Sequence, residues 1–316
     1  MDINKHDNIG YNEIIQSSVN TPLISIIIPT YRRPFKVRKA IISAIQQDTN
    51  TNYEIVIVEN TSDKSPETEA VIRSCKSDRI SYYQNHDNIG MFGNWNRGLR
   101  LAKSEWVTIL CDDDLIENDF ISRATHIIKR TSYRFFCLKN EIFSKEDDLH
   151  HIRNNTFKQH VREKNKFHML LSNQTSTVGN FYKRSIAIAL GGFDESLYPS
   201  SDYDLYLRYI NTEGPYLIDR SKSYGYFRME GNTSSEIKVQ FDFCKKDLIL
   251  QKKCINNLKI NVLKKRLMLS IIKVANRKRL QKLNHQKKSL LFKLELIILS
   301  FYTGMINFLY KKKINI

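Results

Sequence analysis

The stretch Trp106-Val-Thr-Ile-Leu-Cys-Asp112-Asp113-Asp114 decides the fold, because an apolar run ends abruptly in three adjacent carboxylates. Such a run indicates a buried strand that carries negative charge to its carboxyl end, where open α/β sheets bind their ligands. Three neighbouring acids repel one another, so they require a cation or strong hydrogen-bond donors beside them. A hard divalent ion that also contacts phosphate oxygens is the expected occupant.

Short apolar runs rich in β-branched residues alternate with segments of helical period before this stretch. The expected strands are 23–28, 54–58, 79–83 and 106–110, and the expected helices between them are 36–46, 67–75 and 93–102. The alternation predicts an α/β domain with a mixed, mainly parallel sheet that is flanked by helices. Further along we expect a helix at 120–130, a strand at 135–138, surface loops at 139–165, a helix after 166 and another at 201–211.

The positive charge of the chain is concentrated at its carboxyl end. The formal net charge is +17, and residues 236–316 contain 20 Lys and Arg against 4 Asp and Glu. The rest of the chain is therefore almost neutral. We divide the sequence into a polar N-terminal extension (1–21), a globular domain (22–235) and a basic helical tail (236–316).

The end of the tail has the pattern of an amphipathic helix. Leu290, Leu294, Ile297, Phe301 and Met305 recur at spacings of three and four, while charged residues interrupt the run. This pattern favours a helix lying on an anionic membrane surface over one that spans a bilayer. A solvated helix that packs its apolar stripe on the domain is the alternative. Nucleic-acid binding is disfavoured, because aromatic residues that would stack on bases are sparse there.

Cysteine usage and the N-terminus both favour a cytoplasmic protein. The five cysteines are odd in number and widely spaced, so they indicate neither a disulfide framework nor a zinc site. The first residues lack the basic segment and apolar run of a secretion signal. With the tail, this predicts a peripheral position on the inner face of the cytoplasmic membrane.

Two expected strands end in residues suited to gripping a nucleotide. The first ends in Pro29-Thr30-Tyr31, and the second in Glu59-Asn60. Pro29 would stiffen the turn, Tyr31 could lie against a base, and Glu59 could accept from a base imide N–H. Ordinary strand-to-helix turns have the same residue types, so neither motif is decisive alone.

Four blocks in the same order resemble the family 2 glycosyltransferases. They are Ser25–Arg33, Asn88–Gly98, the acidic triplet and Gly191–Arg208, and the resemblance extends from Pro22 to about Ser235. It implies a GT-A fold and transfer of a sugar from a nucleotide donor, with UDP as the expected nucleotide, with inversion at the anomeric carbon. It also implies a glycan or polyprenyl-linked acceptor in bacterial surface-polysaccharide assembly, such as O-antigen or capsule.

Carried over residue by residue, the resemblance implies roles for matching positions. The donor would be held by Pro29, Thr30, Tyr31, Arg33, Glu59, Asp112 and Arg228. Asp113 and Asp114 would hold Mn²⁺ or Mg²⁺, although Cys111 at the start of the motif leaves open which of the three acids contacts the metal. Glu230 fills the position of a histidine in relatives, so only Arg228 is carried over from that element.

Asp202 is the expected catalytic base, because it keeps its place before Tyr203-Asp204-Leu205 although Ser201 replaces a glutamate. It would take the proton of the acceptor hydroxyl. A first-turn acid that stabilises its own helix is the alternative. Asp204 is expected to be structural, because it points away from the helix face of Asp202.

Two other classes of protein remain for comparison. A nucleotidyltransferase would have a glycine-rich phosphate loop after the first strand, and the segment from Thr30 to Pro34 contains no glycine. A non-catalytic nucleotide-sugar-binding or scaffold protein stays open, because Cys111, Ser201 and Glu230 depart from the family pattern.

Overall fold

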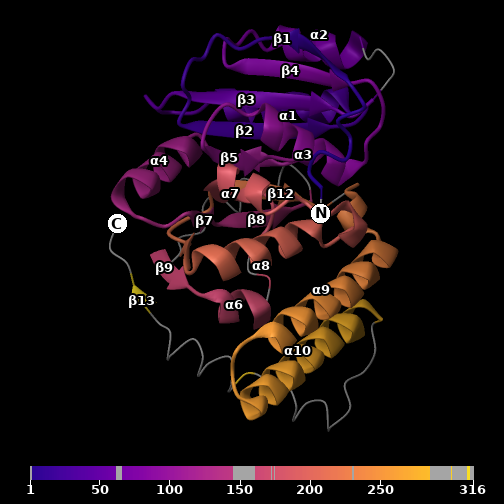
Figure 1. Cartoon of the computed structure of the whole chain (residues 1–316). Helices are drawn as coiled ribbons and strands as arrows, with labels where there is room; N and C mark the ends of the chain where they lie inside the picture. The colour runs from indigo at the N-terminus through magenta and orange to yellow at the C-terminus, as the bar shows by residue number, and fades with distance from the viewer. Residues whose placement is uncertain are drawn as a thin grey trace.

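The computed structural model describes residues 2–61, 66–144, 161–171, 173, 175–229, 231–284, 300 and 312–313 (Figure 1). Within these ranges the strands are β1 Tyr11–Ile15, β2 Ile24–Thr30, β3 Tyr53–Glu59, β4 Ile80–Asn85, β5 Trp106–Ile109, β6 Leu115–Ile116, β7 Phe135–Leu138, β8 Asn140–Phe143, β9 Val161–Lys164, β10 Asn180–Lys183, β11 Tyr216–Asp219, β12 Gly225–Arg228 and β13 Lys312–Lys313. The α-helices are α1 Pro34–Ile45, α2 Pro66–Ser74, α3 Met91–Leu101, α4 Phe120–Arg130, α6 Lys166–Leu171, α7 Arg184–Ala189, α8 Ser201–Glu213, α9 Ile237–Asn257 and α10 Val262–Leu283.

The large sheet is mixed, and its parallel part carries the acidic turn. In the described part of the chain its strand order is β1-β4-β3-β2-β5-β10-β7-β11-β9-β13. Strands β4, β3, β2 and β5 are parallel neighbours, whereas β10 pairs antiparallel with both β5 and β7. A smaller sheet of order β6-β12-β8 lies beyond β5. The predicted α/β fold with a mixed sheet and flanking helices is confirmed.

Alternation along the strands divides the core into two apolar layers. Ile26 and Ile28 of β2 pack in one layer with residues of α1, α2 and α4, and Ile27 packs in the other with α3 and α8. Gly98 lets α3 approach β2 closely, because a Cβ atom there would clash with the Cγ2 atom of Ile27. The sheet is therefore covered on both faces, and its carboxyl edge stays free for ligands.

The N-terminal segment differs from the predicted polar extension. Residues 11–15 form β1, which pairs antiparallel with β4 at the edge of the large sheet. The preceding residues contact α3, where the buried Arg97 donates to the carbonyl groups of His6 and Ile9 at 3.0 and 2.8 Å. The charged side chains suggested solvent exposure, but backbone pairing is independent of side-chain polarity.

The described residues 139–144 and 161–165 also differ from the expected surface loops. They contain β8 and β9, which pair with β12 and β11 respectively. The strand β10 was not predicted either, although it lies between β5 and β7 in the large sheet. Both β8 and β9 are short and largely polar, and pairing with remote strands decides their conformation.

The described part of the basic tail forms a helical hairpin that packs on the domain. Helix α9 begins at Ile237, one residue after the expected start of the tail at 236, and α10 packs beside it (Figure 1). Leu250, Ile255, Met268 and Ile272 join the core layer that contains α3 and α8. This half of the tail is thus part of the globular body.

Apart from Ser300, the predicted amphipathic helix around 290–309 lies outside the described residues, as does Glu230. No helix among the described residues has both the length and the apolar character needed to cross a membrane.

Candidate active site

The acidic turn follows β5 at the carboxyl edge of the large sheet. Asp112 accepts a hydrogen bond from the Thr30 hydroxyl at 2.8 Å and another from the Arg33 guanidinium at 3.2 Å. Arg33 also reaches Asp113 at 3.2 Å, and the Lys36 ammonium lies 3.6 Å from the same carboxylate. The end of β2 and the start of α1 therefore supply the compensating donors that the acidic triplet requires.

The three carboxylates have different environments. Burial raises the pKa of Asp112, the positive charge of Arg33 opposes that shift, and the negative charge of Asp113 adds to it. Burial raises the pKa of Asp114 well above its usual range, and Asp113 acts in the same direction. Asp114 is fully buried, and its Oδ1 atom accepts a hydrogen bond from the backbone N–H of Arg228 at 2.9 Å.

A pocket of about 370 Å³ opens in front of Asp112 and Asp113. Pro29, Thr30, Tyr31 and Arg33 line it, as expected for the donor side. We call this space the donor pocket. Asp114 is not among its lining residues, so Asp113 is the better placed of the two acids that the sequence assigned to a metal ion.

Two other predicted donor residues lie outside the lining of the donor pocket. Glu59 is fully buried and accepts a hydrogen bond from the Tyr82 hydroxyl. The Arg228 guanidinium lies 4.8 Å from the ring centre of Phe143, on the neighbouring strand β8. Their roles in binding the base and the diphosphate stay predictions.

A network of asparagines shapes the wall of the donor pocket opposite the acidic turn. Asn60 donates to the Asn88 side chain at 2.8 Å and to the Gly90 carbonyl at 3.1 Å. Asn85 donates to Asn60 and Asn94 at 3.2 and 2.9 Å. Sequence reasoning placed Asn88 and Asn94 in a family block and Asn60 at the end of the second expected strand, but it assigned none of the three a role of its own. Asn60, the residue after Glu59, lines the pocket.

Asp202 lies in the first turn of α8 and faces a second, larger pocket of about 770 Å³. Burial raises its pKa to about 6, the Tyr203 backbone N–H opposes the shift, and the negative charge of Asp247 adds to it. A carboxylate with this pKa is suited to accept a proton near neutral pH. Asp204, in contrast, pairs with Arg208 at 2.7 Å, in agreement with its expected structural role.

The two pockets adjoin. Seven residues line both of them: Met91, Trp95, Cys111, Pro199, Asn232, Ser234 and Phe243. The acidic turn and Asp202 therefore line two adjoining spaces. The larger pocket extends to α9 and α10. We call it the acceptor-side pocket, because Asp202, the expected base for the acceptor hydroxyl, lines it.

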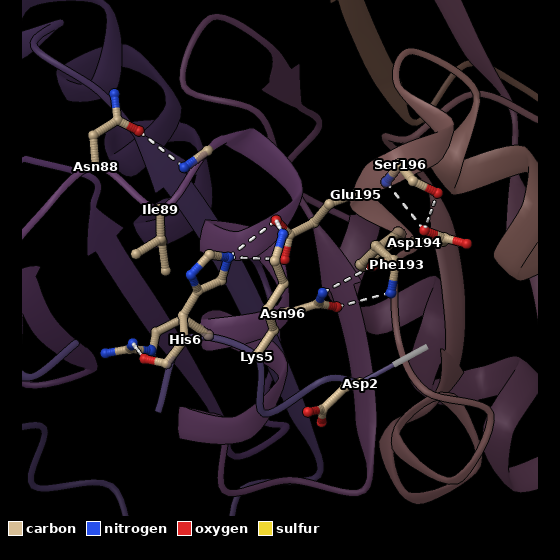
Figure 2. Close-up of polar contacts among 12 residues, drawn as sticks. Asp2, Lys5, His6, Asn88, Ile89, Asn96, Phe193, Asp194, Glu195 and Ser196 are labelled. Atoms are coloured by element: carbon tan, nitrogen blue, oxygen red, sulfur yellow. Dashed lines mark hydrogen bonds and ion pairs between the residues drawn. The ribbon is translucent and has the colours of Figure 1, made fainter. Parts of the chain in front are cut away.

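The turn before α8 is fastened to α3 by backbone contacts. The Asn96 side chain donates to the Phe193 carbonyl at 2.9 Å and accepts from the Phe193 N–H at 2.8 Å (Figure 2). Arg208 donates to the carbonyl groups of Leu190 and Gly192 at 2.6 and 2.7 Å. These contacts hold the start of α8, and with it Asp202, at a fixed place relative to α3.

The acidic turn offers carboxylate oxygens that could bind a divalent cation, but only if a ligand completes the coordination. Carboxylate oxygens are the ligands that Mg²⁺ and Mn²⁺ prefer. The described residues contain no group of three or more His, Cys, Asp or Glu side chains that could hold a metal ion by itself. Asp113, with Asp112 beside it, therefore fits the kind of site in which one or two carboxylates bind the ion and substrate phosphates complete its coordination.

Solved structures share this architecture. The chain superposes on Staphylococcus aureus TarS 1-349 in complex with UDP-GlcNAc with a TM-score of 0.65 and 19% identity, covering 87% of this chain and 79% of that one. It superposes on the Pyrobaculum calidifontis mannosyltransferase PcManGT in complex with GDP-Man and Mn²⁺ with a TM-score of 0.58 and 14% identity, covering 92% and 82%. At these identities the likeness establishes the GT-A fold.

Relatives found by sequence similarity include proteins named as glycosyltransferases. The chain is 26% identical over 209 residues to the putative colanic acid biosynthesis glycosyl transferase WcaA of Escherichia coli, covering 64% of this chain and 71% of that one. It is 27% identical over 215 residues to the GalNAc(5)-diNAcBac-PP-undecaprenol beta-1,3-glucosyltransferase of Campylobacter jejuni, covering 67% of each. Residues 25–188 match the family model described as glycosyl transferase family 2, and the chain belongs to this family of glycosyltransferases.

Proposed function

We propose that this glycosyltransferase moves a sugar from a nucleoside diphosphate, UDP being the first candidate, to a hydroxyl of a lipid-linked glycan, with inversion at the anomeric carbon. The observation that carries the proposal is that the two pockets adjoin and have seven lining residues in common. Asp112 and Asp113 line one, and Asp202 lines the other. Inversion requires a leaving group and a base on opposite sides of the sugar.

On the donor side, Tyr31 would contact the base while the asparagine network holds the wall of the pocket. Arg33 and Lys36 lie within 3.6 Å of Asp113 and place positive charge where the diphosphate would bind. Positive groups fixed at that position favour the charge that the leaving group gains in the transition state. A Mn²⁺ or Mg²⁺ ion on Asp113 would supply the same kind of stabilisation as a Lewis acid.

On the acceptor side, Asp202 would take the proton of the attacking hydroxyl as the new C–O bond forms. The displaced nucleoside diphosphate leaves with the electron pair of the broken bond. The pKa of about 6 leaves most of Asp202 ionised at neutral pH, so it can act as the base without prior loss of a proton.

Two relatives support the proposed substrates. TarS was solved in complex with UDP-GlcNAc, and the Campylobacter jejuni relative is named for an undecaprenol-linked acceptor. A lipid-linked acceptor would place this protein at the inner face of the cytoplasmic membrane, in surface-polysaccharide assembly. The basic tail would add attraction to anionic lipid.

A thermal-shift and hydrolysis screen of nucleotide sugars, with and without Mn²⁺, tests the proposal. A ligand that binds only the folded protein stabilises it by about 2.7 kcal/mol at 100 times its dissociation constant. We expect one donor to stabilise the protein only with metal, and Asp113→Asn to abolish that effect. Absence of any shift or hydrolysis would contradict the proposal. Donor binding without turnover, in the wild type as in Asp202→Asn, would instead favour the scaffold alternative.

A further inference from the structure

The far wall of the acceptor-side pocket is built by the helical hairpin α9–α10, outside the segment that matches the family model. Asp247 and Gln251 come from α9, and Asn276 and Arg279 come from α10. The family match ends at residue 188. The family resemblance therefore assigns no role to these four side chains, although they share one pocket with Asp202.

Two buried oxygen atoms in this wall have no hydrogen-bond partner within the described part of the chain. They are Oδ1 of Asp247, whose residue is 4% exposed, and Oδ1 of Asn276, whose residue is 8% exposed. A buried polar atom without a partner costs roughly 1–3 kcal/mol. Such atoms in a pocket point to a ligand that supplies the missing hydrogen bonds.

The other contacts of these residues fix what kind of ligand would fit. Arg279 donates to Oδ2 of Asp247 at 2.7 Å, and its positive charge compensates the charge of the carboxylate. Oδ1 of Asp247 can still accept a hydrogen bond from a ligand. Gln251 donates to the Tyr203 hydroxyl at 3.2 Å, and Tyr203 donates to the Met169 carbonyl. These bonds tie α9 to α8, directly beside Asp202.

Both unpartnered atoms accept hydrogen bonds, so the ligand must donate them. A sugar ring offers several hydroxyl donors, whereas an ionised phosphate offers only acceptors. The aromatic rings of Trp95 and Phe243 line the same pocket, and its volume of about 770 Å³ lies within the usual range of roughly 300–1,000 Å³ for ligand sites.

We propose that Asp247 and Asn276 bind hydroxyl groups of the acceptor sugar and so place its nucleophilic hydroxyl at Asp202. This inference rests on the proposed function, and it makes the helical hairpin of the basic tail a determinant of acceptor choice. The membrane would then meet only more distant parts of the tail, because these side chains are occupied with the glycan.

Binding of octyl glycosides of glucose, galactose, N-acetylglucosamine and N-acetylgalactosamine provides the test. Saturation-transfer NMR would measure their binding to the full chain, and donor hydrolysis without acceptor would be measured in parallel. We expect at least one glycoside to bind, and Asp247→Ala and Asn276→Ala each to weaken that binding at least tenfold. The thermal shift with nucleotide sugar, measured on the same variants, shows whether the donor pocket is intact.

Matched variants on the same hairpin serve as controls. Asp242→Ala and Asn257→Ala remove the same side chains from α9 at positions that do not line the pocket, and they should bind the glycoside like the wild type. Melting temperatures show which variants are folded, and Asn276→Ala decides the matter if Asp247→Ala does not fold.

Three results would overturn the inference. One is equal glycoside binding by wild type and folded variants, and another is a protein that hydrolyses donor but binds no glycoside. The third is displacement of the bound glycoside by inorganic pyrophosphate in the wild type but not in Arg279→Gln. That result would make the pocket a phosphate site built on Arg279. Failure of the proposed function is distinct, because no nucleotide sugar would then be bound or hydrolysed.

Discussion

Asp114 accepts a hydrogen bond from the backbone N–H of Arg228 at 2.9 Å, so the last acid of the triplet joins β5 to the small sheet. The acid is fully buried, whereas Asp112 and Asp113 line the donor pocket. The triplet thus combines an internal tie with two carboxylates that face the ligand space. Three identical residues in a row therefore differ in their roles, one structural and two directed at the pocket.

Asp114→Ala should lower the free energy of unfolding by about 1–3 kcal/mol, because it leaves the partly buried N–H of Arg228 without this acceptor. Denaturant unfolding of the purified variants measures this. Asp113→Ala should unfold near the wild-type midpoint but lose the metal-dependent stabilisation by donor. The assignment of Asp114 to the fold would be wrong if its variant kept full stability and lost only the metal effect.

The pH dependence of transfer should follow Asp202. Because the base must be ionised, and its pKa is raised to about 6, kcat/KM should rise with pH, reach half of its maximum near pH 6 and level off above about pH 7. At pH 5 about a tenth of the maximal value should remain. Initial rates at several acceptor concentrations between pH 4.5 and 8 give this profile.

Asp247→Asn should move the midpoint of that profile to lower pH. The negative charge of Asp247 raises the pKa of Asp202, so removing it leaves a more acidic base. The shift of the midpoint is separate from any loss of acceptor affinity, which changes the height of the profile. An unchanged midpoint would assign the acid limb to another group.

Gly192→Ala should destabilise the protein more than Gly214→Ala. Both glycines have positive φ, 67° and 88°, so both substitutions carry a backbone cost. Only at Gly192 would the new Cβ atom collide with Oδ1 of Asn96, which holds the Phe193 backbone, while nothing lies within 4 Å at Gly214.

The difference between the melting temperatures of Gly192→Ala and Gly214→Ala measures the cost of the collision with Asn96, because both variants carry the backbone cost. Because the Asn96–Phe193 contact positions the start of α8, Gly192→Ala should also reduce transfer more than donor hydrolysis. Equal effects of the two substitutions on stability and transfer would show that the contact is unimportant.

The donor side was largely predictable from the sequence, because its residues follow strands whose ends meet at one edge of the sheet. Thr30, Arg33, Asp112 and Asp113 come from such ends and line one pocket. Glu59 shows the limit of this reasoning. As the last residue of β3 it has the right position along the chain, yet its side chain is buried against Tyr82, and Asn60 takes the place in the pocket.

The acceptor side was hidden from the sequence for a different reason. Asp247 and Asn276 lie in the basic tail, which the sequence analysis interpreted by its positive charge. Their positions on two helices do not show which residues pack against them. They meet Asp202 only because α9 and α10 fold back on α8, a long-range contact that local pattern does not encode. The two acids of α9, Asp242 and Asp247, within a basic segment were the available signal.

Removing residues 2–9 should lower stability by about 1–3 kcal/mol, because Arg97 loses both carbonyl acceptors of its charge-assisted hydrogen bonds, at His6 and Ile9. Glu195→Gln is the control. It removes only the contacts of Glu195 with Lys5 and His6 (Figure 2), and partly exposed pairs contribute at most about 1 kcal/mol. Denaturant unfolding of both proteins measures the difference. Arg97 neighbours Asn96, so the deletion should also lower transfer. A deletion no more harmful than Glu195→Gln would make the segment a dispensable extension, as its polar sequence suggested.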